Sequence, residues 1–176
     1  MDTPFELTTA RMRLRRICAD DLDDLVALDA DPAVMAYISG GVPNSRQTYL
    51  DGLLPRMMAF SDRPFGYAAA LVDGRFVGWF HLRPSVADPG VLELGYRLQQ
   101  QVWGRGLATE GGRALVRHAF EALGQDAVDA CADPRNAASI RVMEKCGMRR
   151  VGTFVHPLVP LEVVRYLVHR DELAAT

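Results

Sequence analysis

The 176-residue sequence lacks most of the features that mark membrane, nucleic-acid-binding or disulfide-rich proteins. No apolar run approaches the roughly twenty residues that a membrane-spanning helix needs. Its 20 basic and 22 acidic residues give a net charge of −2, which provides no excess of positive charge for nucleic acid. The three cysteines, Cys18, Cys131 and Cys146, are odd in number and far apart, unlike a disulfide framework or a CxxC metal site. We therefore expect no metal, no membrane and no nucleic-acid partner.

The start of the chain also lacks the uninterrupted apolar segment of a secretory signal peptide, so a cytoplasmic location is expected.

Lysine is nearly missing, because Lys145 is the only one and arginine supplies all other Lys and Arg positions. A hydrophobic content of 49% and this length are typical of one compact globular domain. We expect a single domain over residues 1–176.

The most informative stretch is residues 92–112, which has the pattern of a strand, a glycine turn and a helix. Apolar residues alternate with Glu93, Gly95 and Arg97, as in a half-buried strand. Gly104 and Gly106 follow, and a helical pattern begins at residue 107. Glycines at a helix N-terminus leave amide N–H groups uncovered at the positive end of the helix dipole. This arrangement favours a phosphate or diphosphate ligand.

Two familiar nucleotide-binding turns fit poorly. A P-loop would need Gly-Lys-Ser/Thr after the turn, and none follows. A dinucleotide-binding turn would need a third glycine where Thr109 stands. Gly-x-Gly also occurs in turns that bind nothing, so the turn alone leaves a purely structural role open.

The other elements are predicted from periodicity and turn signals. Strands at 65–72 and 75–83 are joined by Asp73-Gly74, a strong hairpin signal, and the short connections favour an antiparallel meander with the strand at 92–98. A helix over 107–123 and a buried strand over 127–132 form a βαβ unit. In the N-terminal part, a strand is predicted at 13–17 and a helix at 21–30, which Asp20 would cap and whose first-turn acids would stay hydrated. Another helix is predicted after Ser45. In the C-terminal part, a last helix from Pro134 or Asn136 to Lys145 and a hairpin of 150–155 with 163–169 are predicted.

Two motifs carry a resemblance to a known family. Residues 101–106, Gln-Val-Trp-Gly-Arg-Gly, resemble the Gln/Arg-x-x-Gly-x-Gly/Ala signature of the GNAT superfamily of acyl-CoA N-acyltransferases. Residues 136–139 followed by 142–148 resemble the Asn-x-x-Ser and Glu-Lys-x-Gly-Phe motifs of its RimJ/RimL branch, which acetylates ribosomal-protein N-termini. The resemblance covers nearly the whole chain.

This resemblance implies the fold and the co-substrate. The expected fold class is α/β (α+β), with a mixed, mostly antiparallel sheet of about seven strands flanked by about four helices. A V-shaped splay between the two central strands would hold the pantetheine arm of acetyl-CoA. The residues implied to bind acetyl-CoA are Tyr96, Arg97 and Leu98 along the pantetheine, Val102, Trp103, Gly104, Arg105, Gly106, Leu107, Ala108 and Thr109 around the diphosphate, and Asn136 on the far wall.

The implied reaction is transfer of an acetyl group from acetyl-CoA to a primary amine by direct attack. An alkyl amine has a pKa of about 10, so a base or a water relay must remove a proton before the attack. Glu93 is the candidate base, although it could instead order water or pair with an arginine. His81 and Tyr96 are weaker candidates, and the N–H of Leu98 is the expected oxyanion donor.

The proton for the departing thiolate has no obvious donor. Many family members have a Tyr seven residues after the motif Asn, and here that position is Met143, whose thioether cannot donate a proton. Ser139 lies one helical turn after Asn136 and is the candidate replacement. A Ser in a first helical turn can equally bond its own backbone, and solvent could supply the proton.

The sequence leaves the acceptor and the assembly open. The acceptor could be a protein or peptide N-terminus or a small-molecule amine, and residues 39–46 and 155–161 are the expected selectivity segments. A non-catalytic acyl-CoA-binding or sensing module is the main alternative to an enzyme. A homodimer is a possible assembly, because the apolar C-terminal hairpin would need cover at a sheet edge.

Overall fold

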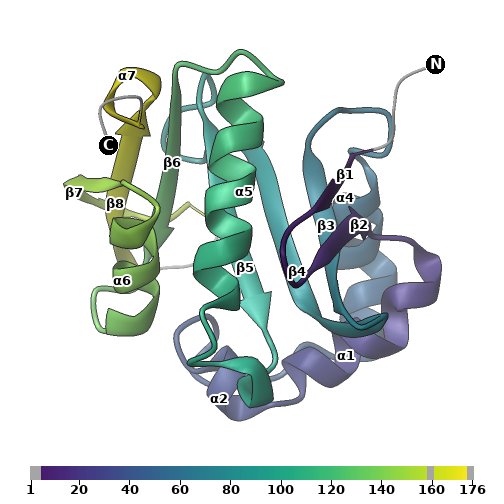
Figure 1. Ribbon diagram of the computed structural model, residues 1–176. Helices are drawn as coiled ribbons and strands as arrows, with labels where there is room; N and C mark the ends of the chain where they lie inside the picture. Colours follow the sequence, from purple (N-terminus) through teal and green to yellow (C-terminus); the bar gives the residue numbers. More distant parts are fainter. Residues whose placement is uncertain (1–4, 158–160, 174–176) are drawn as a thin grey trace. The chain divides into compact units, whose positions relative to one another are not determined.

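The computed structural model describes residues 5–157 and 161–173 (Figure 1). These residues form an eight-stranded sheet in the order β1-β2-β3-β4-β5-β6-β8-β7. The chain divides into two compact units that interleave in sequence: unit 1 holds the residues up to His81 and Tyr96–Leu107, and unit 2 holds Leu82–Gly95 and the residues from Ala108 onward. Strands β4 and β5 each contribute to both units.

The strands are mostly antiparallel, as expected. They are β1 (Glu6–Thr8), β2 (Arg13–Arg16), β3 (Gly66–Val72), β4 (Arg75–Pro84), β5 (Leu92–Leu98), β6 (Ala127–Ala132), β7 (Arg149–Val155) and β8 (Glu162–His169). Strand β5 pairs in parallel with β6, while β1–β2, β2–β3, β6–β8 and β7–β8 are antiparallel. The sheet has one strand more than expected, because β1 is only three residues long and too short for a periodic signal.

The helical segments are more numerous and shorter than the four that were expected. They are η1 (Ala19–Asp21), α1 (Leu22–Asp29), α2 (Pro32–Met35), α3 (Arg46–Thr48), the π-helical turn η2 (Tyr49–Leu53), α4 (Leu54–Met58), η3 (Gln100–Val102), α5 (Leu107–Glu121), α6 (Ala137–Lys145) and α7 (Arg170–Leu173). Helix α5 ends two residues before the predicted end. Helix α6 is not the last, because α7 follows β8.

In unit 1, helices α1 and α4 pack on the strands around β3. Their shared core is aliphatic and aromatic and consists of Ile17, Leu22, Leu25, Leu28, Val34, Tyr49, Leu54, Met57, Tyr67, Ala69 and Trp79. The predicted turn between β3 and β4 is confirmed, with Asp73 and Gly74 at φ angles of 50° and 75°. Positive φ at both central residues is what a two-residue type I′ hairpin requires.

The prediction of hydrated acids at the start of the first helix is wrong for Asp21. This side chain is buried, and both of its oxygens accept hydrogen bonds from Arg15, at 2.7 and 2.8 Å. The backbone N–H of Cys18 also donates to it, at 2.9 Å. Asp20 is not the cap, because the first turn is the 3₁₀ segment η1 with Cys18 at its N-cap position.

The helix predicted after Ser45 is confirmed at its start and interrupted inside. The Ser45 hydroxyl accepts a hydrogen bond from the Thr48 N–H at 3.1 Å, as an N-cap does. The turn η2 then separates α3 from α4. Tyr49 in η2 is 1% exposed and donates its hydroxyl hydrogen to Asp29 at 2.7 Å, so this aromatic belongs to the core of unit 1.

In unit 2, α5 packs on the face of β5 that carries Leu94. A Cβ atom on Gly112 of α5 would lie 3.4 Å from Leu94 and 2.8 Å from the sulfur of Cys146 at the end of α6. Because side chains alternate along a strand, Glu93 projects to the opposite face. Its register partner on β6 is Asp129, so the sheet of unit 2 has one face toward the helices and one face with buried carboxylates.

The predicted C-terminal hairpin is also confirmed. Strand β8 pairs with β6 on one side and with β7 on the other, so β7 ends the sheet. Val151 and Val155 on β7 are 53% and 69% exposed. Residues 158–160 of the expected selectivity segment 155–161 lie outside the described residues.

Within the described part of the chain, no helix has both the length and the apolar character to cross a membrane.

The contact of Gly78 with β5 gives a testable prediction about the fold. A Cβ atom at Gly78 would lie 2.1 Å from the carbonyl oxygen of Arg97, and its φ of +143° is rarely adopted by other residues. Because the clash is with backbone, we expect Gly78→Ala to lower the free energy of unfolding by at least about 2 kcal/mol. Urea denaturation followed by circular dichroism measures this difference.

Gly152→Ala is the matched control, because a Cβ atom there meets no heavy atom within 4 Å. It should change stability by less than about 0.5 kcal/mol. Equal stability of Gly78→Ala and the unaltered protein would contradict the close approach of β4 and β5.

Candidate functional site

The glycine turn at the end of β5 is built by residues of unit 1. Val102 and Leu107 are buried and fix the two ends of the turn, and Trp103 donates its indole N–H to the carbonyl oxygen of Leu98 at 2.8 Å. Gly104 and Gly106 have φ angles of +73° and +79°, in the region that glycine adopts without strain. The structure thus places both predicted glycines where only a residue without Cβ is unstrained.

The turn also has room for a ligand group. A Cβ atom at Gly104 would meet no heavy atom within 4 Å, and one at Gly106 would meet only the Nη2 atom of Arg11, at 3.5 Å. Trp103 and Arg105 are exposed. The residues present therefore fit an anionic group held against backbone, as the phosphates of a nucleotide-bearing ligand require.

The strand before this turn is held by a buried ion pair that the sequence did not predict. Asp29 is 0% exposed, and it accepts hydrogen bonds from Arg97 at 2.5 Å, Tyr49 at 2.7 Å and Asn44 at 2.7 Å. The Arg97 guanidinium also lies over the Trp79 ring, 5.1 Å from its centre. Burial and the neighbouring Asp29 carboxylate raise the pKa of the Tyr49 hydroxyl. Arg97 thus binds inward with its side chain and ties β5 to the end of α1.

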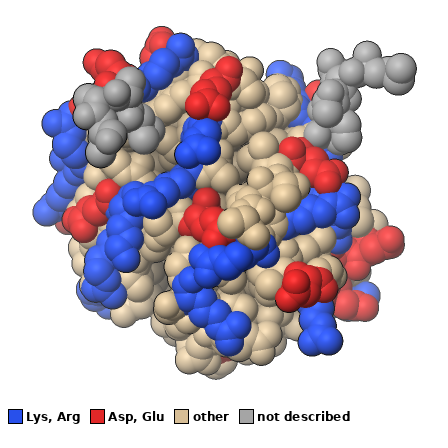
Figure 2. Space-filling model, in the orientation of Figure 1, with Lys and Arg blue, Asp and Glu red and all other residues tan. Residues whose placement is uncertain are grey.

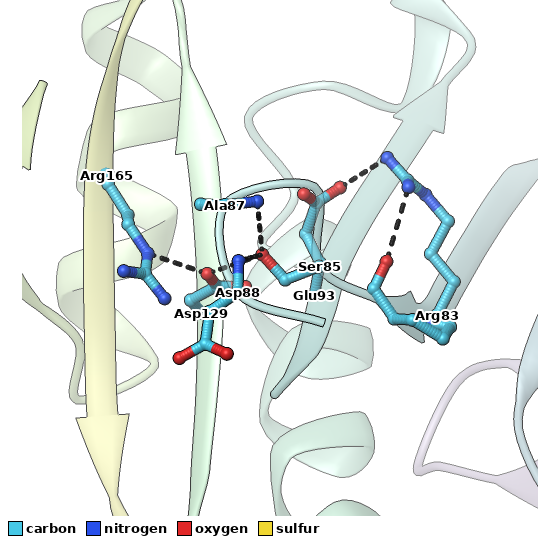
Figure 3. A network of polar contacts seen from close by, with 8 residues as sticks. Arg83, Ser85, Ala87, Asp88, Glu93, Asp129 and Arg165 are labelled. Atoms are coloured by element: carbon cyan, nitrogen blue, oxygen red, sulfur yellow. Dashed lines mark hydrogen bonds and ion pairs between the residues drawn. The ribbon is translucent and has the colours of Figure 1, made fainter. Parts of the chain in front are cut away.

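In unit 2, Glu93 and Arg83 form a second ion pair (Figure 3). Glu93 is 5% exposed, and its Oε1 atom accepts a hydrogen bond from the Nη2 atom of Arg83 at 2.7 Å. Both side chains lie on or beside the sheet, Arg83 on β4 and Glu93 on β5. Pairing with an arginine was one of the three roles that the sequence left open for Glu93, and the structure shows this pairing.

A third pair lies next to Glu93 on the same face of the sheet. Asp129 is 1% exposed, and its Oδ2 atom accepts hydrogen bonds from Ser85 and Arg165, each at 2.7 Å (Figure 3). The Ser85 hydroxyl in turn accepts from the N–H groups of Ala87 and Asp88, at 3.1 and 3.3 Å. The other oxygen of Asp129, Oδ1, is buried without a hydrogen-bond partner in the described residues.

The two carboxylates affect the groups around them. Burial raises the pKa of Asp129 above its usual value, and the charge of Glu93 adds to this effect. Burial, with Glu93 and Asp129 nearby, also raises the pKa of Cys131 to about 12, so its thiol stays protonated at neutral pH. Burial lowers the pKa of His156, which favours the neutral imidazole. Burial therefore favours the uncharged forms of Cys131 and His156 beside the two ion pairs.

The start of α6 gives Asn136 a structural role as well as the coenzyme contact that the sequence motif implies. Its Oδ1 atom accepts a hydrogen bond from the Ser139 N–H at 3.1 Å, which makes Asn136 the N-cap of α6. Ser139 is half-buried in the first turn, and Met143 is only 2% exposed. Met143 therefore packs in the core, and it is not presented at a surface as a proton-donating Tyr would need to be.

The weaker candidate bases lie among aromatic rings in unit 1. His81 is buried, stacked on Trp79 and in edge contact with Tyr67, with ring centres 5.7 and 5.0 Å apart. Tyr96 is half-buried and its ring centre lies 5.7 Å from that of Phe80.

The structure thus distributes the predicted site residues over both units. Tyr96 to Leu98 and Val102 to Leu107 belong to unit 1, whereas Glu93, Ala108, Thr109, Asn136 and Ser139 belong to unit 2. Sequence reasoning missed Asp29 and Asp129. The available signal was an acid inside an otherwise apolar stretch, in LVALD for Asp29 and in AVDACA for Asp129.

No group of three or more His, Cys, Asp or Glu side chains that could hold a metal ion occurs in the described ranges. On the face drawn in Figure 2, basic and acidic side chains are interspersed and no field of one sign is visible.

Comparisons with known proteins agree with the family that the sequence motifs resemble. The family described as "Acetyltransferase (GNAT) domain" matches residues 11–149. FsC-acetyl coenzyme A-N(2)-transacetylase of Aspergillus fumigatus is 33% identical over 180 residues, which cover 94% of this chain and 77% of that protein.

Solved structures show the same fold at lower identity. A GNAT-family acetyltransferase from Bacillus anthracis is similar with a TM-score of 0.79 and 22% identity, covering 94% of this chain and 99% of that one. The aminoglycoside acetyltransferase AAC(6')-Ib in complex with coenzyme A and kanamycin has a TM-score of 0.78 and 20% identity, covering 94% and 98%. With a family match over most of its length, a glycine turn between β5 and α5 and the expected mixed sheet, this chain belongs to the GNAT acetyltransferase family.

Proposed function

We propose that this protein is an acetyl-CoA-dependent N-acetyltransferase that acetylates a primary amine. The observation that carries the proposal is the turn at residues 100–107, with two left-handed glycines and open space beside them. Family membership supports the same reading. Acetyl-CoA would supply an activated acetyl thioester, and the protein would supply binding, orientation and proton handling.

The binding residues in this proposal are those implied by the sequence motifs. The turn would bind the diphosphate, the backbone of Tyr96, Arg97 and Leu98 would bind the pantetheine arm, and Asn136 would add a contact from α6. The ion pair of Arg97 with Asp29 supports this role of β5, because it fixes the strand from its side-chain face. Two register pairs join β5 to β6, and such short pairing is what a splay between these strands predicts.

Glu93 is the proposed base and Ser139 the proposed proton donor to the thiolate. Glu93 is buried next to a second carboxylate, in surroundings where a proton can be held. Its ion pair with Arg83 fixes the direction of the carboxylate. The hydroxyl of Ser139 lies in the first turn of α6, next to the N-cap Asn136.

The proposed acceptor is defined by its chemical class, which is a primary amine. AAC(6')-Ib was solved with the aminoglycoside kanamycin, and the A. fumigatus relative is named for transfer to an N(2) amine. We retain a protein N-terminus, in line with a RimJ/RimL-type protein, as an equal candidate. We also propose one catalytic domain over residues 1–176, a cytoplasmic location and a homodimer, the last supported by the exposed valines on the end strand β7.

A panel of amines with acetyl-CoA, followed by the release of free thiol, tests the function. Turnover with any amine supports the enzyme, whereas binding of acetyl-CoA without turnover across the panel supports a non-catalytic sensing module.

Gly106→Val should abolish detectable binding of acetyl-CoA. The branched side chain would occupy the space beside the turn and force a β-branched residue into a left-handed conformation. Isothermal calorimetry measures the affinity, which we expect to be micromolar for the unaltered protein. Gly124→Val is the matched control, because its φ of +67° imposes a similar strain at a distant helix end. Unchanged affinity in a folded Gly106→Val protein would reject the binding role of the turn.

Glu93→Gln should lower kcat roughly ten- to a thousandfold and leave the acetyl-CoA affinity nearly unchanged, as expected for loss of a proton acceptor. The variant keeps the shape of the side chain but weakens the pair with Arg83, so its melting temperature must be measured alongside. The pH dependence of kcat/KM separates the two roles. If the rate and the pH profile both match the unaltered enzyme, Glu93 is structural.

Ser139→Ala should lower kcat several-fold and change acetyl-CoA affinity by less than about twofold. The loss is modest because solvent can protonate a thiolate, whose conjugate thiol is fairly acidic. The alanine keeps the N–H that Asn136 binds, so the helix cap stays intact. An effect confined to acetyl-CoA affinity would instead make Ser139 a ligand of the coenzyme.

A further inference from the structure

Four charged side chains of unit 2 form a row across neighbouring strands of the sheet (Figure 3). The row consists of Arg83 on β4, Glu93 on β5, Asp129 on β6 and Arg165 on β8, in the order in which these strands lie in the sheet. Glu93 and Asp129 are register partners, and each is paired with the arginine on its outer side. Two negative charges are therefore adjacent in the middle of the row, and one positive charge lies at each end.

Asp129 stands between Glu93 and Arg165 in this row. Adjacent strands lie about 4.8 Å apart, and β6 separates β5 from β8. Figure 3 shows Arg165 reaching Asp129 from the side away from Glu93. Because electrostatic interactions weaken with distance, the negative charge of Asp129 acts on Glu93 more strongly than the positive charge of Arg165 does. The Asp129–Arg165 pair is thus a dipole whose negative end faces Glu93, at a site that solvent screens poorly.

Hydrogen bonds hold Asp129 in place through one oxygen alone. Ser85, in the β4–β5 connection, and Arg165 both donate to its Oδ2 atom at 2.7 Å. The Oδ1 atom is buried, and no hydrogen-bond donor reaches it within the described part of the chain. A buried acceptor without a donor is costly for stability and rare in folded proteins. A carboxylate that served only as a structural ion pair would gain from a donor at this oxygen.

The other titratable groups near Glu93 carry no second negative charge. Cys131 follows Asp129 on the same face of β6, and His156 comes directly after β7. Burial favours the uncharged forms of both by raising the pKa of Cys131 to about 12 and lowering the pKa of His156. The ion pair with Arg165 favours the ionised form of Asp129. Among the described residues around Glu93, Asp129 therefore supplies the negative charge.

We propose that Asp129 is a positioning residue for the reaction, which makes Glu93 a stronger base by holding a negative charge beside it on β6. The inference rests on the proposed function and on Glu93 as its base, and it adds a residue that acts through Glu93 alone. An ordinary carboxyl group has a pKa of about 4 and an alkyl ammonium one of about 10, so an ordinary carboxylate is a weak acceptor for the proton of the amine. A neighbouring negative charge favours the protonated carboxyl group, which makes the carboxylate a better acceptor.

The pH dependence of kcat/KM in the full chain tests this role. The acidic limb of the profile should report the ionisation of Glu93, and Glu93→Gln should abolish it. Asp129→Asn keeps the side-chain shape and leaves Arg165 charged. It should shift the limb to lower pH by about one unit and lower kcat several-fold, because Glu93 becomes a weaker base. The double variant Asp129→Asn/Arg165→Gln removes both charges and should return the limb at least halfway.

Asp126→Asn is the matched control, since it makes the same substitution one residue before β6. The side chain of Asp126 is 99% exposed, so solvent screens its charge and the limb should stay within about 0.2 pH unit. A purely structural role of Asp129 would lower the melting temperature and kcat without moving the limb. A limb that Asp129→Asn leaves in place or moves to higher pH overturns the proposal.

Carboxyl ¹³C NMR gives a second readout that needs no turnover and also applies should Asp129→Asn not fold. The effect of two neighbouring charges on each other is mutual, so Glu93→Gln should lower the pKa at which Asp129 titrates. An unchanged titration of Asp129 overturns the proposal and leaves the proposed function standing. A limb that persists in Glu93→Gln rejects Glu93 as the base and the role of Asp129 with it. Absence of turnover with every amine would instead reject the proposed function.

Discussion

Burial of charged carboxylates is the constraint on which much of the described structure depends. A carboxylate removed from water is costly unless an opposite charge and hydrogen bonds compensate for the lost hydration. Each buried carboxylate in the described part of the chain has an arginine partner. The pairs are Asp21–Arg15, Asp29–Arg97, Glu93–Arg83, Asp129–Arg165 and Asp133–Arg135. Four of the five join different secondary-structure elements, so they fix how those elements meet. Removing one member of a buried pair typically costs about 3–5 kcal/mol, because the other charge stays buried.

These pairs also explain why arginine stands at the buried positions. Its planar guanidinium can bind a carboxylate and a backbone carbonyl together, as Arg15 does with Asp21 and the Arg16 carbonyl oxygen. It can also lie on an aromatic ring, as Arg97 does on Trp79. A lysine ammonium can also approach an aromatic ring, but it lacks the planar fork that binds two acceptors in a fixed geometry. The single lysine, Lys145, is exposed at the end of α6. Codon bias can account for the general arginine content, but at the buried positions the geometry itself favours arginine.

Local signals predicted the elements well, and long-range pairing explains most of what they missed. The Asp73-Gly74 turn, the cap at Ser45 and the strand Ala127–Ala132 depend on neighbouring residues, and all three are present as predicted. The strand β1 and the ion pairs depend on partners far along the chain. Arg97 and Asp29 are 68 positions apart, so no local pattern connects them. The glycine turn was predicted because its φ requirement is a property of the residue itself, whereas Arg11, 94 positions from its partner Arg105, gave no signal.

The carboxylate pair on β5 and β6 shows how structure limits the possible chemistry. Glu93 and Asp129 are register partners on one face of the sheet, yet each is bound to its own arginine. Two adjacent carboxylates without such partners would share a proton, because both could not stay ionised in a buried site. With Arg83 and Arg165 present, the four side chains form a neutral group, and burial still raises the pKa of Asp129. The proposed role of Glu93 as the base therefore depends on how Arg83 and Arg165 hold these two carboxylates.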